Sequence, residues 1–152
     1  MQVRGAYMEQ ERKAAAALGY ASPVHPDKPS TDRSYHRAVE LLLNEVASGK
    51  AEVMVATHNQ ETLQFALERI HTLGLSPLDG TVMFGQLLGM GDHLTYPLAQ
   101  AGYHANKVAP YGPLDDIMPY LSRRAQENRG IITNAQAERF LYARELKRRL
   151  WG

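Results

Sequence analysis

Four polar side chains near the C-terminus fall at helical spacing and could together bind a carboxylate. Tyr120, Arg123, Arg124 and Glu127 occupy positions i, i+3, i+4 and i+7, so on one helix they share a face. Two adjacent arginines suit this task because a planar guanidinium can bind a carboxylate through two parallel hydrogen bonds. The alternative is a solvated charged face with arginine–glutamate pairs along the helix, and the residues alone favour that alternative.

Three further polar segments follow short apolar runs that read as strands. They are residues 4–7 (RGAY), 57–59 (THN) and 85–87 (GQL), and Val108 ends a fourth, weaker run. In parallel α/β folds, ligands bind at the carboxyl ends of strands, which makes these segments candidate binding positions. His58 could hydrogen-bond a cofactor or act as a general base; the alternative is a polar side chain satisfied by the backbone.

The glycines beside these strand ends give only weak signals. Residues 85–91 (GQLLGMG) match neither the dinucleotide fingerprint nor a phosphate-binding P-loop, so the residues favour a tight turn after a strand over a phosphate site. Gly5 would let a ligand approach the backbone closely, although a simple turn after a strand is the alternative.

Composition excludes several classes of site and partner. The 152 residues contain no cysteine, which rules out disulfides, thiolate catalysis and cysteine-based zinc sites. The six histidines lack ligand spacing, so we expect no metal site. A net charge of +1 provides no strong field for nucleic acid, and we expect no nucleic-acid partner.

Apolar runs with strand character alternate with helical patterns along the chain, which predicts βα units and a parallel sheet. Expected helices cover residues 8–18, 33–48, 60–73, 94–101, 116–128 and 134–150, and expected strands cover 53–56, 81–84 and 106–109. Pro23, Pro26 and Pro29 predict a loop over residues 21–30, after which Thr31 or Asp32 caps a helix. Pro119 is tolerable in the first turn of a helix that starts at Asp116.

This pattern amounts to about three and a half strands, each followed by a helix. Half of a (β/α)8 barrel has this organisation, since a whole barrel needs about 250 residues. A flavodoxin-like open sheet is the competing topology, and periodicity alone does not separate the two.

Six short segments, in order and across nearly the whole chain, together resemble the proline dehydrogenase family, in its eukaryotic mitochondrial form. They are residues 3–7 (VRGAY), 53–59 (VMVATHN), 84–90 (FGQLLGM), 100–103 (QAGY), 109–113 (APYGP) and 120–128 (YLSRRAQEN). The resemblance implies that residues 1–152 form one partial domain, about strands five to eight of a (β/α)8 barrel with an additional C-terminal helix.

The same resemblance assigns residues to two groups. Those expected along FAD are Arg4, Gly5, Ala6, Thr31, Thr57, His58, Asn59, Gln86 and Glu127. Those expected around the substrate are Arg123 and Arg124 at its carboxylate, Tyr120 against its ring, Leu87 and Val108 as walls, and Tyr7 as a shield at the flavin.

The implied reaction is oxidation of L-proline, or 4-hydroxy-L-proline, to pyrroline-5-carboxylate or its 3-hydroxy form. Hydride passes to flavin N5 and electrons pass on to quinone. If the source is eukaryotic, the implied location is the matrix side of the mitochondrial inner membrane, with peripheral membrane contact by the full-length protein.

Three departures bear on these expectations. The basic residue that the family places near flavin N5 would fall at Met1, and the aspartate and lysine of earlier strands have no counterpart. Val108 stands where proline-specific members carry tyrosine and hydroxyproline-specific members serine, so it widens the pocket without selecting hydroxyproline. Two hypotheses result: a segment of an FAD dehydrogenase, inactive by itself, or a non-catalytic half-barrel without flavin.

Overall fold

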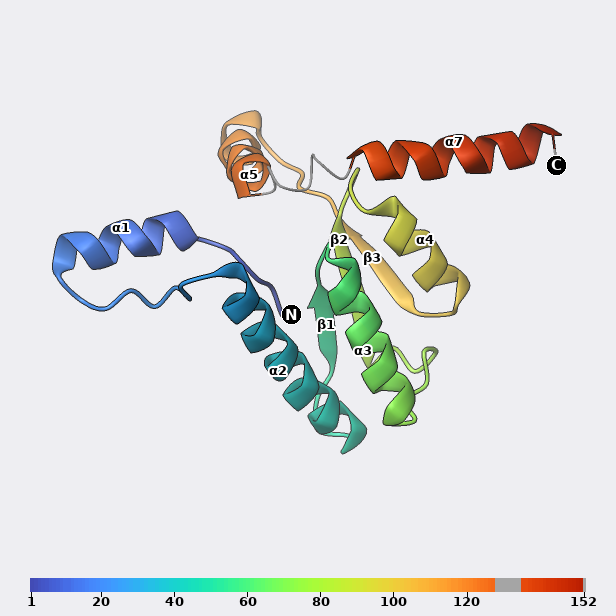
Figure 1. The fold of residues 1–152 in the computed structure, drawn as a ribbon, viewed down its shortest axis with the longest axis horizontal. Helices are drawn as coiled ribbons and strands as arrows, with labels where there is room; N and C mark the ends of the chain where they lie inside the picture. The colour runs from blue at the N-terminus through green and yellow to red at the C-terminus, as the bar shows by residue number, and fades with distance from the viewer. Residues whose placement is uncertain (128–134, 152) are drawn as a thin grey trace.

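A computed structural model describes residues 1–127 and 135–151, which contain a parallel sheet of three strands (Figure 1). The strands β1 (Val53–Ala56), β2 (Val82–Leu87) and β3 (His104–Val108) lie in the order β1-β2-β3. Gln2 adds a parallel bridge on the outer side of β1: its N–H donates to Met54 O at 2.8 Å, and its carbonyl accepts from Ala56 N at 3.0 Å. Spatial order thus follows chain order, without the reversal of a doubly wound sheet.

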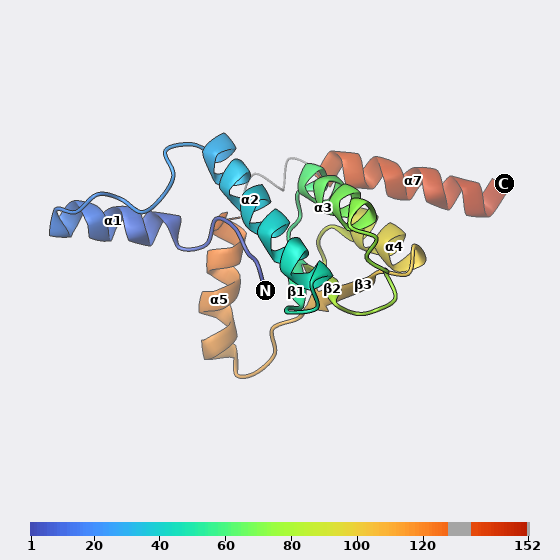
Figure 2. The ribbon, with the colours of Figure 1, turned by 90° about the horizontal axis from the view of Figure 1, so that it is seen from below.

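Three helices cover one face of this sheet: α2 (Lys28–Ala47), α3 (Gln60–Thr72) and α4 (Asp92–Gln100) (Figure 2). The helix α1 (Met8–Leu18) precedes them, and α5 (Leu114–Glu127) follows the carboxyl end of β3. The last described helix, α7 (Ala135–Trp151), extends away from the sheet (Figure 1).

The hydrophobic core lies between the sheet and these helices. Along β1 burial alternates, so Val53 and Val55 face the helices while Met54 and Ala56 face the other side. Val55 and Phe84 from the strands meet Leu43 of α2, and all three side chains are completely buried. Each such side chain contributes about 1.5–3 kcal/mol by leaving water, so this layer fixes the strand ends that build the site.

The expected loop over residues 21–30 is wrong at its C-terminal end, because α2 begins at Lys28 and not at Arg33. Asp27 is the N-cap, and its carboxylate accepts from Ser30 N at 2.7 Å. Pro29 falls in the first turn, where its missing N–H costs no helical hydrogen bond. Neither Thr31 nor Asp32 is therefore a cap.

Other boundaries shift by a few residues. The strand β2 continues to Leu87 and so includes Gly85 and Gln86, while β3 begins at His104. The helices α3 and α4 span Gln60–Thr72 and Asp92–Gln100 instead of the expected 60–73 and 94–101. Because α5 begins at Leu114, Pro119 lies inside the helix and beyond its first turn. The expected helix ends at Asn128 and Asn134 fall outside the described residues.

Candidate functional site

A cleft of about 1010 Å³ opens at the carboxyl end of β1. The N-terminal segment, which pairs with β1 through the bridge at Gln2, ends at the same cleft. Parts of α1, the loop before α2, and the N-terminal ends of α2, α3 and α4 complete its walls. Six of the nine residues expected along the cofactor line it: Arg4, Gly5, Thr31, Thr57, His58 and Asn59. Segments that are distant in sequence therefore meet where a parallel α/β fold binds its ligand.

Arg4 is held at the base of the cleft by several protein groups. Its Nη1 donates to Asp32 Oδ1 at 2.6 Å and to Thr62 Oγ1 at 3.2 Å. Its Nη2 donates to Thr57 Oγ1 at 3.3 Å, and its Cζ lies 4.9 Å from the centre of the Tyr35 ring. These contacts orient the guanidinium and balance its charge before any ligand arrives.

Tyr35 joins the two strand segments beneath Arg4. Its hydroxyl lies 3.0 Å from the carbonyl oxygen of Gln2 and 3.3 Å from that of Ala56, so its one proton is shared between two acceptors. Burial raises the pKa of Tyr35 from 10.0 to about 12, against the opposing effect of the Arg4 charge. The hydroxyl therefore stays protonated and remains a donor throughout the neutral range.

His58 is oriented by the neighbouring strand. Its Nε2 lies 3.0 Å from the backbone N of Leu87, and because that N–H can only donate, Nε2 must be the unprotonated acceptor. In the neutral ring the proton therefore sits on Nδ1. The sequence alternative for His58, a side chain that bonds the backbone, is confirmed for Nε2, and the residue lines the cleft as well.

Asn59 and Thr57 turn the chain from β1 into α3. Asn59 Oδ1 accepts from Thr62 N at 2.8 Å, which confirms Asn59 as the N-cap of α3. Thr57 Oγ1 accepts from Asn59 N at 3.1 Å as well as from Arg4. Asn59 can thus offer a ligand its amide NH₂, while its carbonyl oxygen is committed to the helix.

Of the other three residues expected along the cofactor, two do not line the cleft and the side chain of the third is not described. Gln86 is 1% exposed; its Nε2 donates to Thr57 O at 3.3 Å and its Oε1 accepts from the Thr95 hydroxyl at 3.1 Å. It therefore supports the cleft wall from behind. Ala6 does not belong to the lining. Glu127 ends α5, and its side chain lies outside the described part of the chain.

Two of the expected substrate residues are brought together on the open face of the sheet. Leu87 and Val108 are register partners at the ends of β2 and β3, and Leu88 N donates to Val108 O at 3.0 Å. Tyr7, at the start of α1, is the one non-glycine residue with positive φ (60°) in the described chain. This left-handed conformation is strained for a residue with a Cβ atom.

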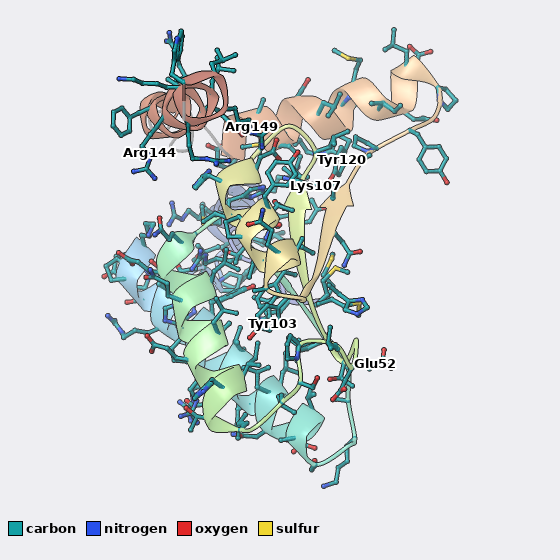
Figure 3. The ribbon with its side chains drawn as sticks, turned by 90° about the vertical axis from the view of Figure 1, so that its right-hand side faces the viewer. Glu52, Tyr103, Lys107, Tyr120, Arg144 and Arg149 are labelled. Carbon is teal, nitrogen blue, oxygen red and sulfur yellow. The ribbon has the colours of Figure 1, made fainter. Side chains whose placement is uncertain are left out.

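The arginine-rich face lies on α5. Arg124 Cζ is 5.2 Å from the centre of the Tyr120 ring, and Arg123 is exposed. Figure 3 shows Tyr120 beyond the carboxyl end of the sheet, on the side where ligands bind in such folds. Among the described residues that line the cleft, none comes from α5.

A sequence profile described as proline dehydrogenase matches residues 2–137 of the chain. The chain belongs to the proline dehydrogenase family. Its relatives include mitochondrial proline dehydrogenase 1 of Drosophila melanogaster, 46% identical, and of Homo sapiens, 50% identical. Hydroxyproline dehydrogenase of Homo sapiens is 49% identical. Each alignment covers 97% of this chain but only 23%, 25% and 32% of the respective relative.

A solved structure of the family resembles the described fold. Proline utilization A (PutA) from Bdellovibrio bacteriovorus, inactivated by N-propargylglycine, superposes with a TM-score of 0.74 at 29% identity. The match covers 82% of this chain and 12% of that protein. The α/β fold with a parallel sheet is therefore a family feature, and the chain spans about a quarter to a third of the curated relatives named above.

Several residues of the cleft were missed by reasoning from the sequence. Arg12, His25, Lys28 and His93 line it, and Lys28 Nζ lies 2.7 Å from Asp32 Oδ2. The i, i+4 spacing of Lys28 and Asp32 was a usable signal, but the assumed loop over residues 21–30 concealed it. His93 carried no such signal, because only the fold brings the start of α4 beside His58.

The described residues contain no group of three or more histidine, cysteine, aspartate or glutamate side chains that could hold a metal ion. Within the same part of the chain, no helix is long and apolar enough to cross a membrane.

Proposed function

We propose that the chain is the C-terminal half, about strands five to eight, of an FAD-dependent (β/α)8 dehydrogenase for proline or 4-hydroxyproline. The observation that carries this proposal is the cleft, which collects six residues expected along FAD from three separate segments. The unreversed strand order and the three helices on one face agree with a barrel segment. Residues 1–152 would then form one partial domain.

The residues of the cleft fit a large cofactor with a diphosphate. A volume of about 1010 Å³ is ample for a dinucleotide. Three basic side chains (Arg4, Arg12, Lys28) and three acidic ones (Asp27, Asp32, Glu61) line it. Asp32 is paired with two of those cations and Asp27 caps α2, so these two carboxylates are already engaged with protein donors.

When bound, FAD would supply the hydride acceptor, and the protein would supply binding and orientation. Arg123 and Arg124 would bind the substrate carboxylate, and Tyr120 would pack on the ring. Leu87 and Val108 would form the wall of the pocket, and Tyr7 would exclude water. The product would be pyrroline-5-carboxylate or its 3-hydroxy form, with electrons passing to quinone.

The proposal also concerns the longer protein. The names of the Drosophila melanogaster and Homo sapiens proline dehydrogenases place them in mitochondria, and we infer the same location here, on the matrix side of the inner membrane with peripheral contact. The missing half of the barrel would supply the remaining cofactor contacts. The isolated chain would therefore show little or no turnover.

A second candidate is a non-catalytic half-barrel that serves as an interaction module. The observation that favours it is that no described residue of α5 lines the cleft, because a substrate site needs the cleft and the α5 arginines together. Flavin binding separates the two candidates, since an interaction module has no need for a cofactor.

The test uses the isolated chain and a chimera in which it replaces the matching segment of human proline dehydrogenase 1. Titration of FAD into the chain, followed by flavin fluorescence, should give saturable binding. Lys28→Met should weaken that binding, because Lys28 lines the cleft, whereas the exposed control Lys50→Met should not. The chimera should be yellow and oxidise proline with an artificial acceptor. A colourless chimera, even with added FAD, would refute the proposal.

A further inference from the structure

The connection between β2 and α4 is short and contains two glycines. After Leu87 the chain runs through two glycines in the left-handed region, Gly89 (φ 79°) and Gly91 (φ 66°). Glycine adopts these conformations freely and loses more conformational entropy than other residues when it is fixed. Residues 88–91, here called the β2–α4 loop, are held by backbone hydrogen bonds from Met90 N to Leu87 O at 3.1 Å and from Leu88 N to Val108 O at 3.0 Å, and side-chain contacts add to these.

Lys107 provides such contacts from the neighbouring strand. Its Nζ lies 2.6 Å from the carbonyl oxygen of Met90 and 2.6 Å from Asp92 Oδ1. The Lys107 side chain is 22% exposed and that of Asp92 31%, so solvent screens the ion pair only in part. An ammonium group suits this position because it is compact and can donate to both oxygens at once. Figure 3 labels Lys107 near the carboxyl end of β3.

His58, which lines the cleft, contacts the last residue of β2 and the last residue of the loop. The backbone N–H of Leu87 donates to His58 Nε2 at 3.0 Å. At the end of the loop, Gly91 lies so close that a Cβ atom there would be 3.3 Å from His58 Cδ2. The N–H of Leu87 thus sets the tautomer of the neutral His58 ring, and Gly91 of the loop borders the ring.

We propose that Lys107 is a positioning residue for the cofactor site: by binding Met90 and Asp92 it fixes the β2–α4 loop and, through it, His58. Lys107 itself does not line the cleft and acts without touching the ligand. That the ligand is FAD rests on the proposed function. The contacts of Lys107 with the loop, and of Leu87 and Gly91 with His58, are independent of it.

The first experiment measures FAD affinity and amide hydrogen exchange of Lys107→Met in the full 152-residue chain. Loss of the ammonium group should weaken FAD binding about tenfold, corresponding to about 1.4 kcal/mol, and should speed exchange at residues 87–92. Lys107→Arg keeps the charge and should restore most of both properties. The exposed control Lys50→Met should change neither.

A second experiment asks whether Lys107 acts through His58. If it does, Lys107→Met should cause no further loss of FAD affinity in a His58→Ala background, since coupled residues are not additive. Full additivity of the two substitutions would overturn the proposal, as would unchanged exchange in Lys107→Met. If Lys107→Met does not fold, Asp92→Asn replaces it, because the contact with Met90 remains.

The two proposals fail in different ways. A wild-type chain and chimera that bind no FAD would contradict the proposed function, while the exchange of the Leu87 amide would still report whether Lys107 holds the loop against His58. FAD binding that is insensitive to Lys107→Met, with normal exchange, would contradict only the role of Lys107.

Discussion

At the scale of single residues, the hydroxyl of Tyr35 contributes to stability beyond the packing of its ring. The side chain is 3% exposed, and the hydroxyl bridges Gln2 and Ala56, the two segments that carry the base of the cleft. Tyr35→Phe keeps the ring but removes this donor, so the free energy of unfolding should fall by about 1 kcal/mol. Urea denaturation measures the change, and Tyr111→Phe, at a 95% exposed side chain, should have no effect.

The same hydroxyl predicts how stability depends on pH. The pKa of Tyr35 in the folded protein is about 12, whereas the unfolded chain has the ordinary value of 10.0. Its contribution to the free energy of unfolding is therefore complete below pH 10 and is lost as pH rises toward 12, because the unfolded state releases its proton first. The stability advantage of the wild type over Tyr35→Phe should shrink between pH 10 and pH 12. An unchanged difference would contradict the raised pKa.

Val108 is the residue that we expect to set substrate preference. It pairs with Leu87 at the end of β3 and is 38% exposed on the open face. Tyrosine at this position would crowd a hydroxyl on the substrate ring, so Val108→Tyr in the chimera should lower kcat/KM for trans-4-hydroxy-L-proline about tenfold relative to L-proline. Val108→Ser should raise kcat/KM for trans-4-hydroxy-L-proline relative to that for L-proline. Equal ratios in all three proteins would show that another residue sets the preference.

At the scale of elements, the start of α3 shows how one residue serves both the fold and the site. Asn59 Oδ1 caps the helix through Thr62 N at 2.8 Å, and the residue also lines the cleft. Asn59→Ala should therefore lower the free energy of unfolding by about 1 kcal/mol and weaken FAD binding. Asn59→Ser keeps a capping oxygen without the amide group. The midpoint temperature of thermal unfolding should therefore return toward the wild-type value, whereas FAD affinity should stay low. Recovery of both would show that the amide does not touch the ligand.

Local chemistry explains which elements could be predicted from the sequence. The bounds of α1, β1 and the start of α3 follow from Gly19, a β-branched run and Asn59, and the structure confirms them. The predicted start of α2 is wrong because Pro29 does not belong to the loop with Pro23 and Pro26: a proline is acceptable in the first turn of a helix. Gln86 was expected along the cofactor, but its burial and its bonds to Thr57 and Thr95 depend on contacts that no local pattern reveals.

At the scale of the whole molecule, the sheet lacks partners at its edges. In the described chain, β3 pairs only with β2, and β1 has only the single bridge to Gln2 beyond its pairing with β2. Unpaired strand edges form hydrogen bonds with other chains. Leu87 and Val108 are neighbours on the face of the sheet opposite α2, α3 and α4. A half-barrel with this structure should therefore associate with itself unless the missing half is supplied.

The isolated chain should accordingly form concentration-dependent oligomers in the micromolar range, seen as a rising mass in light scattering. Co-expression with the N-terminal half of human proline dehydrogenase 1 as a separate polypeptide should replace them with a 1:1 complex, because the added strands occupy the same edges. FAD affinity should rise in that complex, since more of the cofactor would then be enclosed. Asn106 and His104 lie on the exposed side of β3, and Asn106→Asp should reduce self-association by like-charge repulsion. A chain that stays monomeric at all concentrations would contradict the half-barrel.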